Sequence, residues 1–252
     1  MASTSDTGHA KNVANFESLI SFCTGYGAAY NPSNADLQLA NLQTLRTTAL
    51  ADLQNVKVTK TAFDNATNTR QQVFKPLRQL ATRIINALAA SGAQAEVIAD
   101  ARTINRKIQG KAKDEQPVII PSATTPPTPV VTPTDKKIST SQQSFDNLID
   151  HLTQLIQLLT QESNYTPNEP DLTVAALTNT LNSLIKANTL VINAYTAWSN
   201  ARIERNDTLY NPLTGLVQTA LEVKQYVKSI FNASSPQYKQ VSKLQFKTRT
   251  DL

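Results

Sequence analysis

The chain of 252 residues has little of the chemistry on which most enzymes and metalloproteins depend. It contains one cysteine, two histidines and six glycines. One cysteine excludes a disulfide within the chain. The cysteine and the two histidines together supply three ligands, which is too few for a structural zinc site. The sequence has no GxxxxGK[ST] phosphate loop, no HExxH motif and no Cys–His or Ser–His–Asp arrangement. We therefore expect no enzyme, with no catalytic residue, no cofactor-binding residue and no metal ligand.

Long hydrophobic runs are also missing. No apolar stretch approaches the roughly 18–20 residues that cross a bilayer. The first twelve residues, "MASTSDTGHAKN", lack the basic and apolar regions of a secretory signal. We expect a cytoplasmic protein by default and no membrane partner. Export without a cleaved signal, or incorporation into an assembly, stays open.

Charge is scarce and unevenly placed. Charged residues make up 17% of the chain, and the net charge is +5. Residues 1–110 carry eleven basic and seven acidic side chains, whereas residues 141–252 carry nine of each. No basic run is longer than two residues. Because nucleic-acid binders normally show a denser basic stripe, nucleic acid is not the expected partner.

The middle of the chain is rich in proline and threonine. The stretch "QPVIIPSATTPPTPVVTPTDKK" covers residues 116–137. Proline fixes φ and removes a backbone donor, which excludes helix and favours an extended conformation. We predict a linker over residues 114–140, and a ligand for a proline-reading domain is the alternative.

Four sequence blocks recur in the same order on the two sides of this linker. The pairs are "NFESLISF" (15–22) with "SFDNLIDH" (144–151), "YNPSNADL" (30–37) with "YTPNEPDL" (165–172), "TAFDNATNTR" (61–70) with "NAYTAWSNAR" (193–202), and "FKPL" (74–77) with "YNPL" (210–213). Their offsets are 129, 135, 132 and 136 residues. Ordered recurrence of this kind indicates an internal duplication.

Each half also contains a long window without glycine or proline. These windows run from Asn34 to Lys75 and from Asp171 to Asn211. Each predicts one helix of about 40 residues, although breaks near residues 55–61 and at Pro76 and Pro212 remain possible. Period-two alternation is almost absent outside the linker.

These patterns predict an all-α fold of two homologous antiparallel helical bundles, formed by tandem duplication and joined by an extended linker. The expected division is a disordered tail over residues 1–10, a first bundle over 11–113, the linker over 114–140, and a second bundle with a basic C-terminal tail over 141–252.

Several single residues invite a functional interpretation. His9 lies in the expected tail, and His151 is interpreted as a surface or boundary residue of a helix. Cys23 lies on an apolar helical stripe, where a buried structural thiol is expected. Arg70 and Arg202 recur with Asn68 and Asn200. They indicate either an anion or partner site, or arginines that pair across a bundle.

Aromatic and basic residues leave further alternatives open. Tyr195 and Trp198 lie on a predicted core stripe with Ile185 and Ile192, so core packing is expected, with an exposed interface anchor as the alternative. Both halves end in basic residues, which either stabilise helix C-termini or bind an acidic partner. They are Arg102, Arg106, Lys107, Lys111, Lys113, Lys239, Lys243, Lys247 and Arg249. The stretch "KLQFKTRT" (243–250) alternates, which predicts an extended tail that docks elsewhere.

The sequence therefore favours a non-enzymatic structural or protein-interaction module. Two similar bundles would make it bivalent or self-assembling, with a protein partner or a second copy as ligand. A membrane-interacting, toxin-like helical protein is one alternative. Weak binding of nucleic acid or an acidic surface through the basic helix ends is another.

Overall fold

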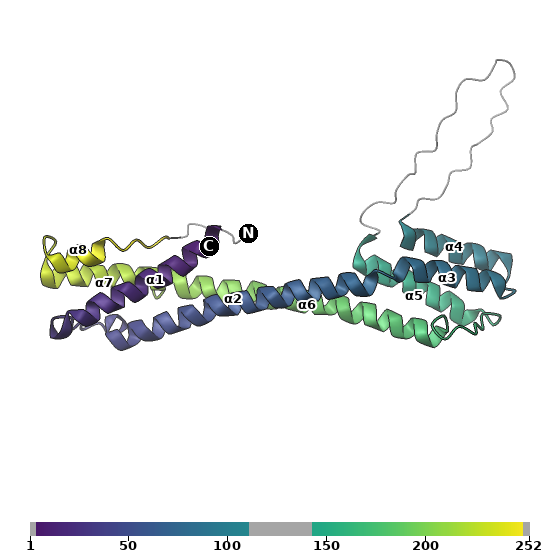
Figure 1. Cartoon of the computed structure of the whole chain (residues 1–252), viewed down its shortest axis with the longest axis horizontal. Helices are drawn as coiled ribbons and strands as arrows, with labels where there is room; N and C mark the ends of the chain where they lie inside the picture. The colour runs from purple at the N-terminus through teal and green to yellow at the C-terminus, as the bar shows by residue number, and fades with distance from the viewer. Residues whose placement is uncertain (1–3, 111–142, 249–252) are drawn as a thin grey trace, which may run out of the picture. The chain divides into compact units, whose positions relative to one another are not determined.

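The computed structural model describes residues 4–110 and 143–248, and these residues form helices and connecting loops without a β-strand (Figure 1). The all-α prediction is confirmed for this part of the chain. The predicted linker, residues 114–140, falls wholly outside the described residues. The helices are α1 (Thr4–Gly25), η1 (Gly27–Ala29), η2 (Ala35–Leu37), α2 (Leu39–Phe74), α3 (Leu77–Ala90), α4 (Ala95–Gln109), α5 (Phe145–Gln161), α6 (Val174–Tyr210), α7 (Leu216–Phe231) and α8 (Pro236–Ser242).

The two long windows form one continuous helix each, α2 with 36 residues and α6 with 37. No break occurs at residues 55–61. Pro76 ends the first window as the N-cap of α3, and Pro212 lies in the turn before α7. At the other end of the chain, the Ser235 side chain caps α8, and Pro236 takes its first position. Both are placements that suit these residue types.

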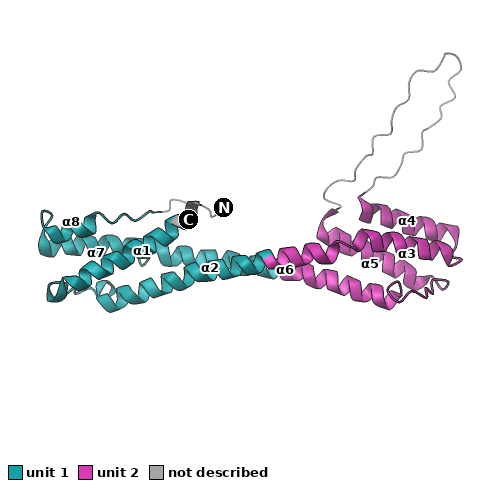
Figure 2. Cartoon of the chain, viewed as in Figure 1, with its two compact units in different colours: residues 1–64, 193–252 teal, residues 65–192 magenta. Residues whose placement is uncertain are grey.

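The helices form two compact units, each of which uses both halves of the sequence (Figure 2). Unit 1 contains residues 1–64 and 193–252, and unit 2 contains residues 65–192. The predicted bundle regions, 11–113 and 141–252, are therefore each divided between the two units. At 1.5 Å per residue α2 is about 54 Å long and α3 about 21 Å. One short helix cannot cover a long one, so the two ends of α2 pack with different neighbours.

The core of unit 1 lies between α1, the first turns of α2, the last turns of α6, and α7 and α8. Phe16 and Leu19 of α1, Leu42 of α2, and Val223 and Val227 of α7 are all fully buried there. They recur every three or four residues on each helix, which places them on one face.

The core of unit 2 lies between α3, α4, α5, the last turns of α2 and the first turns of α6. Ile84 and Leu88 of α3, Ile108 of α4, Leu155 of α5 and Leu177 of α6 are fully buried in it. The Arg83–Asp171 pair and the tyrosine loop described below are positioned by this core.

The prediction of a disordered tail over residues 1–10 is wrong for the part of this range that the structure describes. Helix α1 begins at Thr4, and His9 is only 3% exposed. His9 Nδ1 lies 2.6 Å from the hydroxyl of Tyr210, and Asn12, one turn later, is fully buried. Burial of these polar side chains against α6 extends the helix toward the N-terminus. The sequence did not predict this because the contacts join residues about 200 positions apart.

Candidate functional site

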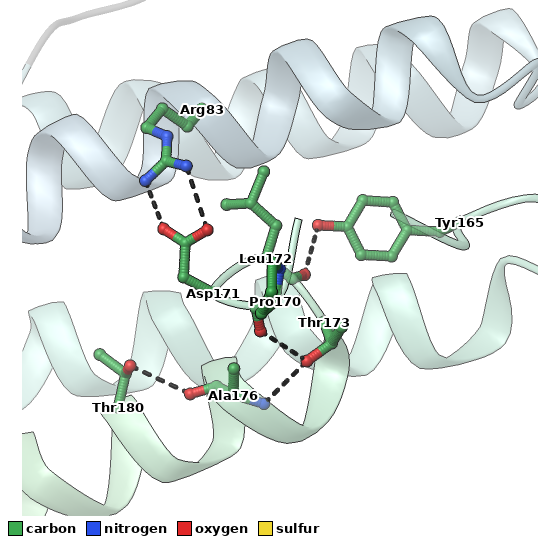
Figure 3. Close-up of polar contacts among 8 residues, drawn as sticks. All are labelled: Arg83, Tyr165, Pro170, Asp171, Leu172, Thr173, Ala176 and Thr180. Atoms are coloured by element: carbon green, nitrogen blue, oxygen red, sulfur yellow. Dashed lines mark hydrogen bonds and ion pairs between the residues drawn. The ribbon is translucent and has the colours of Figure 1, made fainter. Parts of the chain in front are cut away.

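The loop between α5 and α6 in unit 2 is held by one buried tyrosine (Figure 3). Tyr165 is 6% exposed, and its hydroxyl donates a hydrogen bond to the carbonyl oxygen of Leu172 at 2.9 Å. Burial raises the pKa of Tyr165 to about 12. The phenol therefore stays protonated and serves as a structural donor rather than as an acid.

An ion pair ties the same loop to α3. Arg83 donates two hydrogen bonds to the Asp171 carboxylate, at 2.5 and 3.1 Å (Figure 3). Hydrogen bonding to Arg83 holds the pKa of Asp171 below its usual range, and the same contact raises the pKa of Arg83. Both side chains are well exposed to solvent. The pair fixes geometry but stabilises little, as exposed ion pairs generally do.

Beside this loop lies an open hollow of about 550 Å³ on the surface of unit 2. Its lining is Arg83, Asn86, Ala87, Ala90, Ser91, Asn164, Tyr165, Thr166, Pro167, Asn168, Glu169 and Leu172. Arg83 is already paired with Asp171, and no cysteine or histidine lines the hollow. With one carboxylate at its edge, the lining has neither a nucleophile–base pair nor two facing carboxylates. The described lining therefore shows no arrangement of residues that matches a known catalytic group.

The corresponding segment of unit 1 repeats the tyrosine contact. Tyr30 is 6% exposed, and its hydroxyl donates to the carbonyl oxygen of Leu37 at 2.7 Å. In both units the donor and acceptor are seven residues apart, and both precede a long helix. Here the ring of Tyr226 packs edge-on against Tyr30, with centroids 5.4 Å apart at 85°. The Tyr226 ring therefore lies beside Tyr30, where unit 2 has no second aromatic ring on Tyr165 among the described ring contacts.

A cluster of three aromatic side chains in unit 1, here called the aromatic triad, lies outside both cores. It consists of Phe63 on α2 with Tyr195 and Trp198 on α6. Phe63 stacks on Trp198 with centroids 5.5 Å apart, and Tyr195 lies 5.7 Å from Phe63. Tyr195 is 52% exposed. In residues 50–64 and 193–200, all of which the structure describes, no side chain is fully buried.

Two cations frame the triad. Lys60 Nζ lies 5.4 Å from the Trp198 ring centroid, and Arg202 Cζ lies 5.2 Å from it. Lys60 also pairs with Asp64 one turn later. Cations over aromatic faces are common in solvent-facing aromatic clusters and keep the rings in place without burying them.

The predicted core stripe of α6 is therefore wrong in part. Leu177 and Leu184 are fully buried, but Ile185, Ile192 and Tyr195 are 41%, 56% and 52% exposed. Periodicity placed these side chains on related faces of one helix, but only one side of this stretch is covered: Ala187 and Val191 are 5% and 6% exposed, and Asn188 bonds to Arg70 of α2. Trp198 is half-buried against Phe63, which is closer to the interface-anchor alternative than to core packing.

Cys23 and Arg70, which were also singled out in the sequence, take part in packing and pairing within the fold. Cys23 is fully buried, and burial raises its pKa to about 12, which confirms a packed thiol. Arg70 donates to Asn188 at 2.9 Å and lies over the Phe145 ring, so it pairs across the helices of unit 2. Asn68 and Asn200 are exposed. Arg202 instead lies over the Trp198 ring of unit 1.

His151 is not a surface residue, contrary to the prediction. It is 4% exposed on the inner face of α5, and burial lowers its pKa, with the positive charge of Lys107 adding to the effect. The Asp150 carboxylate, 4.0 Å from His151 Nδ1, acts in the opposite direction. Sequence position gave no signal for this burial because His151 interrupts an otherwise apolar face.

The basic residues are dispersed. Arg106 and Lys107 lie in the last turn of α4, and Lys239 lies in the last turn of α8. These positions suit the negative end of the helix dipole. Lys111, Lys113 and Arg249 lie outside the described residues.

In the described ranges, no three histidine, cysteine or acidic side chains come together in a way that could hold a metal ion. Among the same residues, no helix combines the length and apolar character required to cross a bilayer. Comparison of the chain with protein-family models, with curated proteins and with solved structures found no match.

Proposed function

We propose that the protein is a non-enzymatic interaction module that associates with a second copy of itself through the aromatic triad of unit 1. The observation that carries this proposal is an aromatic cluster outside both cores, in which Tyr195 is 52% exposed and Phe63 and Trp198 are half-buried. Aromatic residues contribute more binding free energy per residue than most others, because they bury a large rigid surface at low entropic cost.

Two further exposed aliphatic side chains lie on the same stretches of helix. Val58 on α2 is 55% exposed, and Ile203 on α6 is 65% exposed. Each is five residues from Phe63 or Trp198, about 140° around the helix axis, so both are isolated exposed aliphatic residues of an ordinary kind and the proposal does not rest on them. The framing cations Lys60 and Arg202 resemble the polar rim that surrounds the apolar centre of many interfaces.

The groups beside the hollow of unit 2 support the non-enzymatic part of the proposal. The Tyr165 phenol stays protonated, and Arg83 and Asp171 satisfy each other. The pKa shifts keep Tyr165 and Arg83 protonated and Asp171 ionised, whereas a general acid or base requires a pKa moved toward the working pH.

We also infer that the chain arose by tandem duplication. The hydrogen bonds of Tyr30 and Tyr165 support this inference, since both reach a leucine carbonyl seven residues later at the same place before a long helix. The buried pairs Leu42 with Leu177, and Ala49 with Leu184, continue the same offset of 135 residues. A duplicated chain would present two related units to its partners.

Trp198 makes a direct test possible because it is the only tryptophan in the chain. We expect the weight-average mass from light scattering to rise with concentration, and the Trp198 emission to shift to the blue as the triad becomes buried. The Tyr195→Ala variant should weaken association by about thirtyfold, the effect of losing an aromatic anchor worth about 2 kcal/mol.

Leu213→Ala provides the matched control. Leu213 is 81% exposed but lies in the turn before α7, so its truncation should leave association unchanged. A constant monomer mass and constant Trp198 emission at every concentration would contradict self-association through the triad.

A further inference from the structure

The C-terminal segment of unit 1 docks in an extended conformation on the side of α1. After α8 ends, residues 243–248 continue without helix along α1 and α7 (Figure 1). Their exposure alternates: Leu244 and Phe246 are half-buried against the unit 1 core, whereas Gln245 and Lys247 are exposed. This confirms the predicted extended tail, and alternation with period two is the signature of an extended segment with one buried face.

Two asparagines of α1 hold the main chain of this segment. Asn12 donates from Nδ2 to the carbonyl oxygen of Lys247 at 2.9 Å, and its Oδ1 accepts from the amide of the same residue, also at 2.9 Å. One helical turn later, Asn15 donates to the carbonyl oxygen of Gln245 at 2.6 Å. A single side-chain amide that bonds both main-chain groups of one residue fixes the direction and register of the segment.

Helix α7 contributes a third polar contact. Lys224 donates from Nζ to the carbonyl oxygen of Leu244, and its ammonium lies 5.1 Å from the Phe246 ring centroid. Ile85 is the ninth residue of α3, as Lys224 is the ninth residue of α7, so unit 2 has an aliphatic side chain where unit 1 has this ammonium group.

All four of these hydrogen bonds are made to main-chain atoms of the segment. No side chain of Gln245 or Lys247 is used for them, and the only side chains that pack inward are Leu244 and Phe246. The surface of α1 and α7 therefore selects an extended chain with apolar residues two positions apart. Main-chain hydrogen bonds with pockets for alternate side chains are a recurrent way of binding extended peptides.

We propose that Asn12, Asn15 and Lys224 form a binding site for an extended segment, here called the tail site, and that its second occupant is the C-terminal segment of another copy of this chain. Every copy carries the one sequence that the tail site is known to fit. The contacts do not distinguish the segment of the same chain from that of a neighbour. Exchange of identical segments between copies is a low-cost route to association, because it repeats contacts that each copy already makes.

This exchange goes beyond the proposed function and does not depend on it, because the tail site shares no residue with the aromatic triad. Within one chain the segment is present at a high effective concentration, so it normally occupies its own tail site. Exchange then needs either high protein concentration or the loss of one copy's own segment.

Two full-length variants that complement each other test the proposal. The first carries Asn12→Ala and Asn15→Ala, which removes the tail site but keeps the segment. The second carries Leu244→Asp and Phe246→Asp, which removes the segment's apolar contacts but keeps the tail site. We expect each variant alone to be monomeric at low micromolar concentration, and an equimolar mixture to give a one-to-one heterodimer in native mass spectrometry.

A peptide of residues 243–248, "KLQFKT", provides a second readout that needs only the second variant. We expect it to bind that variant and not the unaltered protein, whose tail site is already filled. Methylation of the peptide's amide nitrogen at Lys247 should weaken binding by about tenfold or more, since it removes the donor to Asn12. Alanine at Gln245 and Lys247 of the peptide is the matched control and should leave binding unchanged.

Each outcome decides the proposal. Heterodimer formation together with peptide binding supports it. Peptide binding without a heterodimer would overturn the second copy as occupant, and absence of peptide binding would overturn the tail site itself. Tyr195→Ala introduced into both variants should leave the heterodimer unchanged, which separates this result from the fate of the aromatic triad.

Discussion

The segment between α1 and α2 in unit 1 and the loop between α5 and α6 in unit 2 share a tyrosine hydrogen bond but differ in the helix beside it. Tyr226 is the eleventh residue of α7, and Ala87 is the eleventh residue of α3. Tyr226 packs on Tyr30, and its hydroxyl accepts a hydrogen bond from the Asn31 amide at 3.2 Å. Ala87 instead lines the hollow beside Tyr165. One side chain thus decides whether this place is filled or open.

The comparison teaches that the tyrosine hydrogen bond and its cover are separable. Unit 1 covers its loop with an aromatic ring, whereas unit 2 ties its loop to α3 through Arg83 and Asp171. The two tyrosines are nevertheless equally buried, each 6% exposed, so the difference lies in the neighbouring side chains and not in the burial of the phenol itself. We therefore expect substitutions at equivalent places to have unequal effects in the two units.

The largest effect is expected from Tyr226→Ala. Removing the ring uncovers Tyr30 and should lower the free energy of unfolding of unit 1 by about 2–3 kcal/mol. This loss is smaller than for a fully buried aromatic residue because Tyr226 is only half-buried. Hydrogen exchange of α7 amides would report this loss. The reciprocal change Ala87→Tyr should cost unit 2 less than about 0.5 kcal/mol, and a loss as large as that of Tyr226→Ala would contradict the comparison.

A pH effect is expected in unit 2 through His151. Its pKa is lowered in the folded state, so folding favours the neutral imidazole. The resulting stability is complete above the unfolded pKa of about 6.5 and is lost as the pH falls below that value, by at most about 1.4 kcal/mol for each pH unit. Hydrogen exchange of α5 between pH 7.5 and 5 measures this loss. In His151→Phe the slope should disappear, and an unchanged slope would assign it to other groups.

A smaller and equal effect is expected from Tyr30→Phe and Tyr165→Phe. Each substitution leaves one carbonyl, of Leu37 or Leu172, without its donor and should cost about 1 kcal/mol. Denaturant unfolding followed by hydrogen exchange in each unit would compare them. A clear difference between the two variants would mean that the two hydrogen bonds are not equivalent despite their shared geometry.

The smallest effect is expected from Arg83→Gln. The Arg83–Asp171 pair is exposed, and solvent screens its attraction, so unfolding midpoints of the variant and the original protein should agree within error in low and high salt. Thermal unfolding at two salt concentrations checks this expectation. A large loss that high salt abolishes would show that the ion pair, rather than Tyr165, holds the loop.

Much of the helical structure could be predicted from the sequence because it depends on local properties. Both long helices coincide with windows that lack glycine and proline, and the Ser235 cap follows from residue type. Helix pairing could not be predicted in this way. Periodicity identifies the residues that share a face, but the neighbour that covers this face is set by contacts over about 200 residues, such as those of His9 with Tyr210.

Prediction of the candidate sites from the sequence is limited in the same way, because these sites also depend on contacts between distant residues. The sequence indicated the recurrence of Tyr30 and Tyr165, and it left Trp198 open as an interface anchor. It gave no sign of the hollow, because Ala87 is an unremarkable helix residue until it is compared with Tyr226. The exposure of Tyr195 was missed because the apolar stripe of α6 continues beyond the helices that cover it.

The division of the chain between the units also determines an order of events during synthesis. Unit 2 is continuous, so its residues 65–192 have all been synthesised before the second part of unit 1 is made. Domains generally fold as units as they emerge. Helix α1, although translated before unit 2, has to wait for α7 and the C-terminal segment before its apolar face is covered. The unit whose first helix is made before unit 2 is therefore completed after it.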